Sequence, residues 1–227
     1  MELTVIAHAR NAYTDKFAVP RQSGLVPEVL TRIEFLPPYD NPDALRGIEG
    51  FSHLWLLWLF DRNRVTGFSP TVRPPRLGGN ERLGVFATRS PNRPNPIGLS
   101  AVRLVAVGEG TMTIAGADLA DGTPILDIKP YLPYADAFPD AAGGFVQGLD
   151  ERRVEVNCPE ALLEALPEAD RAPLLSVLSH DPRPAYQQDP ERVYGFQFAH
   201  CEIRFTVRNG RLTVREIQPE SILKKEQ

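Results

Sequence analysis

Proline recurs along the whole chain and limits what the chain can fold into. The 227 residues include 22 prolines and 17 glycines. Proline alone therefore reaches roughly twice its average share of about 5%. Proline lacks a backbone donor and is excluded from helix interiors and central strands. The chain is therefore expected to form short strands joined by structured loops, with few long helices.

The apolar pattern before residue 120 predicts strands. Residues 53–60 would present apolar side chains on both faces of a strand, which predicts a central strand buried on each side. Asn41 before Pro42 predicts a capped helical turn. Several short strands without regular strand–helix alternation favour a barrel or a sandwich over a doubly wound sheet. The predicted strands are residues 3–9, 29–35, 53–60, 82–88, 98–107 and 111–118.

The pattern changes after residue 145. Two amphipathic helices are predicted, and Pro173 is expected in the first turn of the second helix, where it is tolerated. Asn209-Gly210 is a favoured two-residue hairpin turn. The predicted segments are helices 158–166 and 170–178 and strands 196–207 and 211–217. We therefore expect a mainly β domain over residues 1–146 and a small α+β domain over residues 150–227.

Positive charge is concentrated in one segment of an acidic chain. The formal net charge is −4, yet residues 61–103 hold eight arginines, no lysine and two acids. An arginine-only stretch suits a local face that binds phosphate or carboxylate groups. The alternative is a solvated surface whose charges pair within the fold.

Residues 88–100 combine polar side chains with prolines that stiffen the backbone. Pro91, Pro94 and Pro96 fix the dihedral angles of this segment. Arg89, Asn92, Arg93 and Asn95 then project from a rigid loop and are suited to planar anions and base edges. A purely structural crossover is the alternative.

A second dense segment covers residues 119–131. Asp121-Gly122 predicts a turn, and Thr123-Pro124 leads into a short strand. Asp127 and Lys129 are two residues apart and therefore share one strand face. They are either a proton-transfer pair or a structural ion pair.

Several classes of protein are not supported by the sequence. Neither the glycine-rich dinucleotide fingerprint nor the phosphate-binding loop occurs, so a Rossmann cofactor site is not expected. Two cysteines cannot form a disulfide scaffold, and the four histidines lack metal-ligand spacing, so we expect no metal. No apolar stretch reaches the ~18 residues of a membrane helix. We expect a cytoplasmic protein that does not bind membranes.

Five stretches of the chain together resemble one family. The sequence is similar to the TsaA-like family, in particular its TrmO-type tRNA methyltransferases. The resemblance covers most of the chain and rests on "KFAVPRQ" (16–22), "TVRPPRLGG" (71–79), "GVFATRSPNRPNPIGLS" (84–100), "DGTPILDIKPYLPYAD" (121–136) and "DPRPAY" (181–186).

The resemblance implies a small β-barrel that binds S-adenosylmethionine. It implies methylation of the exocyclic nitrogen of threonylcarbamoyl-adenosine, next to the anticodon of threonine tRNA, by a homodimer. Arg73, Arg76 and Arg93 are expected to contact tRNA. The implied cofactor contacts are Pro20, Arg21, Gln22, Asp61, Arg62, Arg89, Leu99, Asp121, Gly122, Thr123 and Pro124.

The acceptor nitrogen belongs to an acylated amine and is a poor nucleophile. Hydrogen bonding to it, or removal of its proton, would assist methyl transfer. Asn95, Asp127 and Lys129 are the polar candidates for this catalytic role, and the sequence does not choose among them. The rival interpretation of the whole chain is a non-catalytic barrel module that binds an adenine-containing ligand or RNA.

Overall fold

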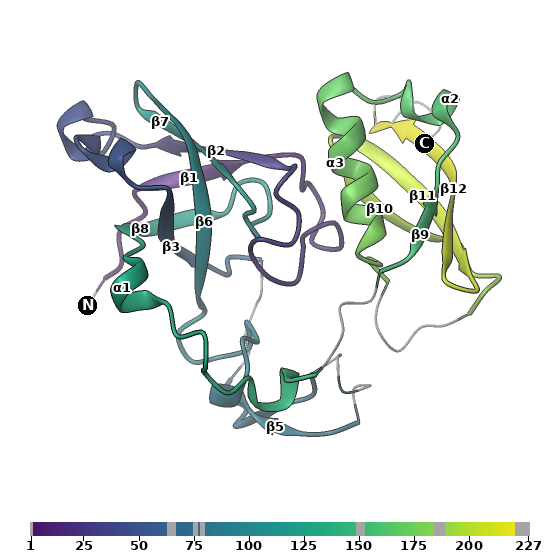
Figure 1. Cartoon of the computed structure of the whole chain (residues 1–227), viewed down its shortest axis with the longest axis horizontal. Helices are drawn as coiled ribbons and strands as arrows, with labels where there is room; N and C mark the ends of the chain where they lie inside the picture. Colours follow the sequence, from purple (N-terminus) through teal and green to yellow (C-terminus); the bar gives the residue numbers. More distant parts are fainter. Residues whose placement is uncertain are drawn as a thin grey trace.

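The computed structural model of the chain contains a closed β-barrel and a separate four-stranded sheet (Figure 1). The structure describes residues 2–62, 67–74, 77, 80–148, 153–183 and 189–220. The loop that follows the first barrel strand faces the second sheet and its long helix. Among the described residues, no helix is long and apolar enough to span a membrane.

Six antiparallel strands close the barrel, which confirms the predicted mainly β fold. Their order around the barrel is β1-β2-β7-β6-β3-β8. Inward side chains such as Ile33, Leu54, Leu56 and Met112 are almost completely buried and form the barrel core. The strands are β1 (Ala7–Arg10), β2 (Leu30–Phe35), β3 (His53–Leu59), β6 (Ile97–Gly108), β7 (Thr111–Ala115) and β8 (Pro124–Pro130).

Strand β3 is central, as predicted, because it pairs with both β6 and β8. The expectation that both of its faces are buried is wrong. Leu54, Leu56 and Trp58 point into the barrel and are buried, whereas Leu57 and Leu59 are only partly buried. A closed barrel has one interior, so only one face of each strand reaches the core.

The predicted strand at residues 82–88 is wrong in most of its length. Only β5 (Leu83–Gly84) forms, and it pairs with β4 (Thr71–Val72). Residues Val85–Ala87 turn into the 3-10 helix η4, whose carbonyl at Val85 accepts a hydrogen bond from Thr88 Oγ1. The other short helices are η1 (Pro42–Leu45), capped by Asn41 as predicted, η2 (Ile48–Gly50), α1 (Pro133–Asp136) and η5 (Gly144–Val146).

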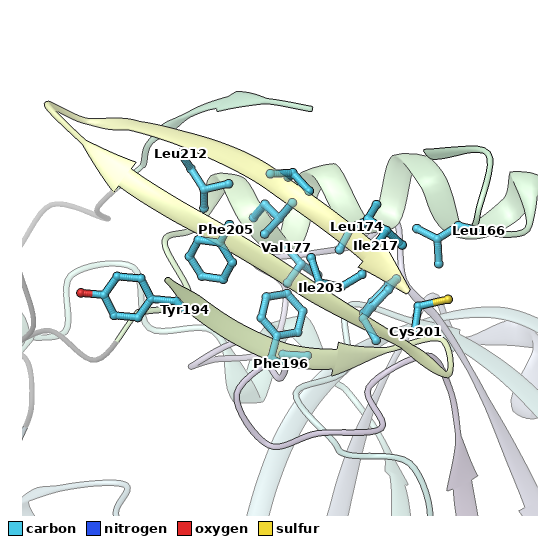
Figure 2. Close-up of a cluster of buried hydrophobic side chains, with 14 of the residues drawn as sticks. Leu166, Leu174, Val177, Tyr194, Phe196, Cys201, Ile203, Phe205, Leu212 and Ile217 are labelled. Carbon is cyan, nitrogen blue, oxygen red and sulfur yellow. The ribbon is translucent and has the colours of Figure 1, made fainter. Parts of the chain in front are cut away.

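The C-terminal sheet has the order β10-β11-β12-β9 and packs against one long helix. Figure 2 shows Leu174 and Val177 of this helix gathered with Phe196, Ile203 and Phe205 of the sheet. The elements are β9 (Glu155–Asn157), α2 (Glu160–Leu163), α3 (Glu168–Ser179), β10 (Tyr194–Phe198), β11 (Cys201–Arg208) and β12 (Arg211–Pro219).

Three details of this region bear on the predictions. The hairpin about Asn209-Gly210 is confirmed. Pro173 lies inside α3 and not in its first turn, because the helix begins at Glu168, directly after Pro167. The predicted strand 196–207 is split into β10 and β11 by a turn at Ala199-His200, whose φ angles of 48° and 59° are both left-handed. Such turns normally contain Asn and Gly, so this one has no sequence signal.

The core of the C-terminal region includes residues from the N-terminal part of the chain. Tyr13, Ala18, Val26 and Val29 of the loop between β1 and β2 are buried in the same cluster as the side chains of α3 and β10–β12. The barrel has its own core, built from residues before 146, whereas the second core combines residues 12–29 with the chain after residue 150. The domain boundaries at residues 146 and 150 stay a prediction.

Candidate cofactor site at the barrel rim

Four segments that are distant in sequence meet at one rim of the barrel. Arg89 Nη1 donates a hydrogen bond to Gln22 Oε1 at 2.5 Å. Arg62 donates to the carbonyl of Thr14 at 3.2 Å and to the carbonyl of Asp121. Gln22 thus contacts Arg89, and Arg62 contacts Asp121. The two pairs are connected because Thr14 and Gln22 belong to the same loop.

The Asp-Gly-Thr-Pro turn is held by β1 and by the residues after it. Gly122 has a φ of 82°, a conformation that glycine adopts without a steric cost, and its N–H donates to Ala9 O at 2.8 Å. The Asp121 carboxylate accepts a hydrogen bond from Asn11 N at 3.1 Å. Thr123 is buried. The turn before β8 is thus rigid and presents backbone groups at the rim.

The loop that carries Pro20, Arg21 and Gln22 is also held in place. Gln22 Nε2 donates to the carbonyl of Arg21 at 2.6 Å, while its Oε1 accepts from Arg89. The N–H of Gly24 donates to Gly116 O at 2.8 Å. The Gly24 hydrogen bond fixes the loop to the residue that follows β7, and the Gln22–Arg89 hydrogen bond connects it to the loop before β6.

Leu99 lies on the outer face of the barrel, where its side chain is 55% exposed. It is directly opposite Leu57, which is in turn opposite Asp127. Asp127 and Lys129 share this face, as predicted, and form an ion pair at 2.8 Å. Asn95 is exposed in the loop before β6. Their catalytic roles stay predictions.

The three arginines expected to contact tRNA have different surroundings. Arg93 Nη2 donates to the carbonyls of Thr88 and Val85, at 2.8 Å and 3.2 Å, so its guanidinium braces its own loop. Arg73 is exposed after β4. Arg76 lies outside the described residues.

Asp118 was missed by the sequence reasoning, although it lies close to this site. Trp58 Nε1 donates to Ser100 Oγ at 2.9 Å, and Ser100 Oγ donates to Asp118 Oδ1. Burial raises the pKa of the Asp118 carboxyl, while the Ser100 hydrogen bond and, to a smaller extent, the charge of Arg89 lower it. The sequence signal for this contact is Ser100, which occupies an inward position of β6 and needs a polar partner because it is buried.

We expect Asp118→Asn to change the pH dependence of stability. The pKa of Asp118 is raised in the folded state. Its contribution to the free energy of unfolding is therefore present below the pKa of the unfolded chain and is lost as pH rises through the pKa of the folded state. The free energy of unfolding of Asp118→Asn, relative to the parent, should therefore increase between about pH 4 and about pH 7. Urea denaturation at both pH values measures it, with exposed Asp140→Asn as the control for loss of one charge. A difference that is independent of pH would contradict the assignment.

The residues at the rim fit a zwitterionic ligand with an apolar part. Guanidinium groups at Arg21 and Arg89 can bind a carboxylate through paired hydrogen bonds. The Asp121 carboxylate lies at the rim, where it offers negative charge near a positive centre, and exposed Leu99 offers apolar surface. A closed antiparallel barrel with charged groups at its rim is the architecture that the resemblance to the TsaA-like family implies.

Comparisons with known proteins support that class. A family model described as the tRNA-methyltransferase O N-terminal domain matches residues 8–137, and the TrmO C-terminal domain matches residues 152–220. The chain therefore belongs to the TrmO family of tRNA methyltransferases.

Individual relatives resemble the chain over nearly its whole length. It is 42% identical over 222 residues to tRNA (adenine(37)-N6)-methyltransferase of Escherichia coli (strain K12), which covers 92% of this chain and 94% of that protein. It is 44% identical over 207 residues to the putative S-adenosylmethionine-dependent methyltransferase RcsF of Pseudomonas aeruginosa, covering 88% and 90%. A crystal structure of TrmO from Pseudomonas aeruginosa matches with a TM-score of 0.78 and 35% identity, over 96% of this chain and 98% of that one.

Proposed function

We propose that the protein uses S-adenosylmethionine to methylate the exocyclic N6 of adenosine 37 in tRNA. The observation that carries the proposal is the convergence of Gln22, Arg62, Arg89 and Asp121 at one rim of the barrel. Gln22, Arg89 and Asp121 come from the segments in which the chain resembles its family, and Arg62 contacts the last of these segments. The preferred substrate is the threonylcarbamoyl-modified adenosine of threonine tRNA, and the enzyme acts in the cytoplasm.

When bound, S-adenosylmethionine supplies an electrophilic methyl group on a positively charged sulfur. Arg21 and Arg89 would hold the carboxylate end of the cofactor, and the turn at 121–124 would contribute carbonyl groups and one carboxylate. Leu99 would supply apolar surface. Pro20, Asp61 and Arg62 would complete the set of residues that hold the ligand.

Methyl transfer requires that the acceptor nitrogen approach in line with the bond that breaks. Positioning by a rigid rim therefore provides a large part of the rate acceleration. The acceptor nitrogen loses its proton during the reaction. Of the three candidates only the Asp127 carboxylate could receive that proton, whereas Asn95 and the ion-paired Lys129 could orient the acceptor through hydrogen bonds. The exposed position of all three side chains leaves them accessible to a nucleotide.

The tRNA backbone meets the arginine-rich segment. Arg73 is exposed, and Arg76 and Arg93 belong to the same net-positive stretch of an acidic chain. Contacts between arginine and phosphate release counterions, so tRNA affinity should decrease with added salt.

The functional unit is a homodimer. The outer faces of β3 and β6 place Leu57 opposite Leu99 and Leu59 opposite Ile97, which leaves an apolar stripe on the barrel surface. Light scattering should give twice the 25.2 kDa mass of the chain. The variant Leu57→Arg should shift that mass toward a monomer, and a monomeric parent would rule the dimer out.

Turnover separates the enzyme from its rival, a non-catalytic module that binds an adenine-containing ligand or RNA. An enzyme releases S-adenosylhomocysteine when S-adenosylmethionine and tRNA are both present, and not when either is omitted. Calorimetry should also show tighter binding of S-adenosylmethionine than of ATP. Binding of both ligands without any release of S-adenosylhomocysteine would support the module.

A further inference from the structure

We infer that the C-terminal region is a structural part of the cofactor site, with Tyr13 and Phe198 as positioning residues that set the affinity for S-adenosylmethionine. The inference rests on the proposed function, because it uses the cofactor contacts assigned there. It concerns residues 11–14, which link the turn between β10 and β11 to the rim of the barrel.

On one side, residues 11–14 are attached to the C-terminal sheet. The N–H of Ala199 donates to the carbonyl of Ala12 at 2.8 Å. The ring of Tyr13 is completely buried and meets the ring of Phe198 edge to face, with centroids 6.1 Å apart. Ala199 lies in the left-handed turn described above, and this conformation costs free energy in a residue other than glycine. The turn is therefore retained despite a local cost.

On the other side, the same four residues hold two of the assigned cofactor contacts. The N–H of Asp121 donates to the carbonyl of Tyr13 at 2.9 Å. Arg62 Nη1 donates to the carbonyl of Thr14 at 3.2 Å. Asn11 donates its backbone N–H to the Asp121 carboxylate and its side-chain amide to Leu119 O, at 3.1 Å and 2.9 Å. A displacement of Tyr13 would therefore move Asp121 and Arg62 together.

A second contact connects the C-terminal region to the loop that carries Pro20–Gln22. Arg21 Nη2 donates to the carbonyl of Arg183 at 3.0 Å. The buried Asp181 carboxylate accepts two hydrogen bonds from the Arg183 guanidinium, at 2.8 Å and 2.9 Å, which fixes the turn that presents this carbonyl. This turn opens the "DPRPAY" stretch, so it gives the first part of that stretch a role at the cofactor site.

The alternative role of the C-terminal region is to bind tRNA through the outer face of its sheet, and the charges of that face do not favour it. Three of the exposed arginines on this face form ion pairs with four nearby glutamates, while Arg215 donates to Thr206 Oγ1 at 3.2 Å. The described part of the face therefore carries little excess positive charge to attract phosphate. The ion pairs are Arg204 with Glu202 and Glu216, Arg208 with Glu191, and Arg211 with Glu155.

A matched pair of core substitutions in the full chain tests the inference. Phe198 and Phe205 are equally buried in the same core, but the ring contacts of Phe205 are to Tyr194 and Phe196 within the sheet. Phe198→Leu should weaken S-adenosylmethionine binding on the order of tenfold, within the range for coupled sites. Phe205→Leu should lower thermal stability as much as Phe198→Leu does, but it should leave the cofactor Kd within about twofold of the parent. Calorimetry without tRNA, at a temperature where circular dichroism shows both variants folded, gives these values.

Two further readouts distinguish positioning from general destabilisation. In Phe198→Leu the KM for S-adenosylmethionine should rise more than the KM for tRNA. Hydrogen exchange at the Asp121 amide should become faster in Phe198→Leu and stay at the parent rate in Phe205→Leu. If Phe198→Leu does not fold, Tyr13→Leu removes the same ring contact from the barrel side. Its control is Tyr13→Phe, which keeps the ring and should bind the cofactor with parental affinity.

The outcomes separate this inference from the function on which it rests. Parental cofactor affinity in Phe198→Leu, or equal loss in Phe198→Leu and Phe205→Leu, would overturn the inference and leave the methyltransferase proposal intact. Failure of the parent itself to bind S-adenosylmethionine would overturn both.

Discussion

Replacing Arg89 with lysine is expected to weaken S-adenosylmethionine binding nearly as much as replacing it with alanine. The expected loss is about 1.5–3 kcal/mol, the range for a hydrogen bond to a charged group. Lysine keeps the positive charge but lacks the planar fork that binds a carboxylate through two hydrogen bonds. In the free protein Arg89 also donates to Gln22 Oε1, and both side chains lie at the surface of the rim. Calorimetry on the two variants measures the loss.

Ligand-free melting temperature separates a binding role from a structural one. Because Arg89 is exposed, both variants should melt near the parent temperature. Arg82→Ala, an exposed arginine in the same segment, serves as the control and should leave cofactor affinity unchanged. Unchanged affinity in Arg89→Lys would remove Arg89 from the site.

Replacing Gly98 with alanine is expected to lower the free energy of unfolding by about 2–4 kcal/mol. An added Cβ would lie 2.1 Å from Trp58 Cε2, well inside contact distance. The Trp58 ring would have to move, which costs packing energy and the hydrogen bond from its Nε1 to Ser100. Urea denaturation with a constant m-value measures the change.

Gly84→Ala is the matched control for that experiment. A Cβ at Gly84 has nothing within 4 Å, and its φ of −57° is accessible to alanine. The control should therefore unfold within about 0.5 kcal/mol of the parent. Parental stability in Gly98→Ala would show that the Trp58 ring does not occupy the space beside Gly98.

The elements that could be predicted from the sequence have local signals. Alternating apolar residues and Asn209-Gly210 carry their own geometric preferences, so β2, β6, β7 and the β11–β12 hairpin were expected where they form. The turn at Ala199-His200 has no such signal, because tertiary contacts to Ala12 hold it against the local preference. The position of Pro173 within its helix differs from the prediction because α3 begins at Glu168, directly after Pro167, and not at residue 170.

The site was only partly predictable for a similar reason. Arg89, Gln22 and the turn at 121–124 lie in stretches that resemble the family, so their grouping was expected. The chain Trp58–Ser100–Asp118 depends on which face of β6 enters the barrel, and that face is fixed by the closure of the whole sheet. The attachment of residues 11–14 to the C-terminal sheet joins positions more than 180 residues apart and has no local pattern.

The proposed reaction transfers a methyl group to one nitrogen of one tRNA nucleoside. It is tested by mass spectrometry of nucleosides from threonine tRNA after incubation with the protein and S-adenosylmethionine. We expect threonylcarbamoyl-adenosine to be replaced by a species heavier by one methyl group, with the methyl on the exocyclic nitrogen. An unchanged nucleoside profile, or a methyl group on a different nucleoside, would rule out the proposed reaction.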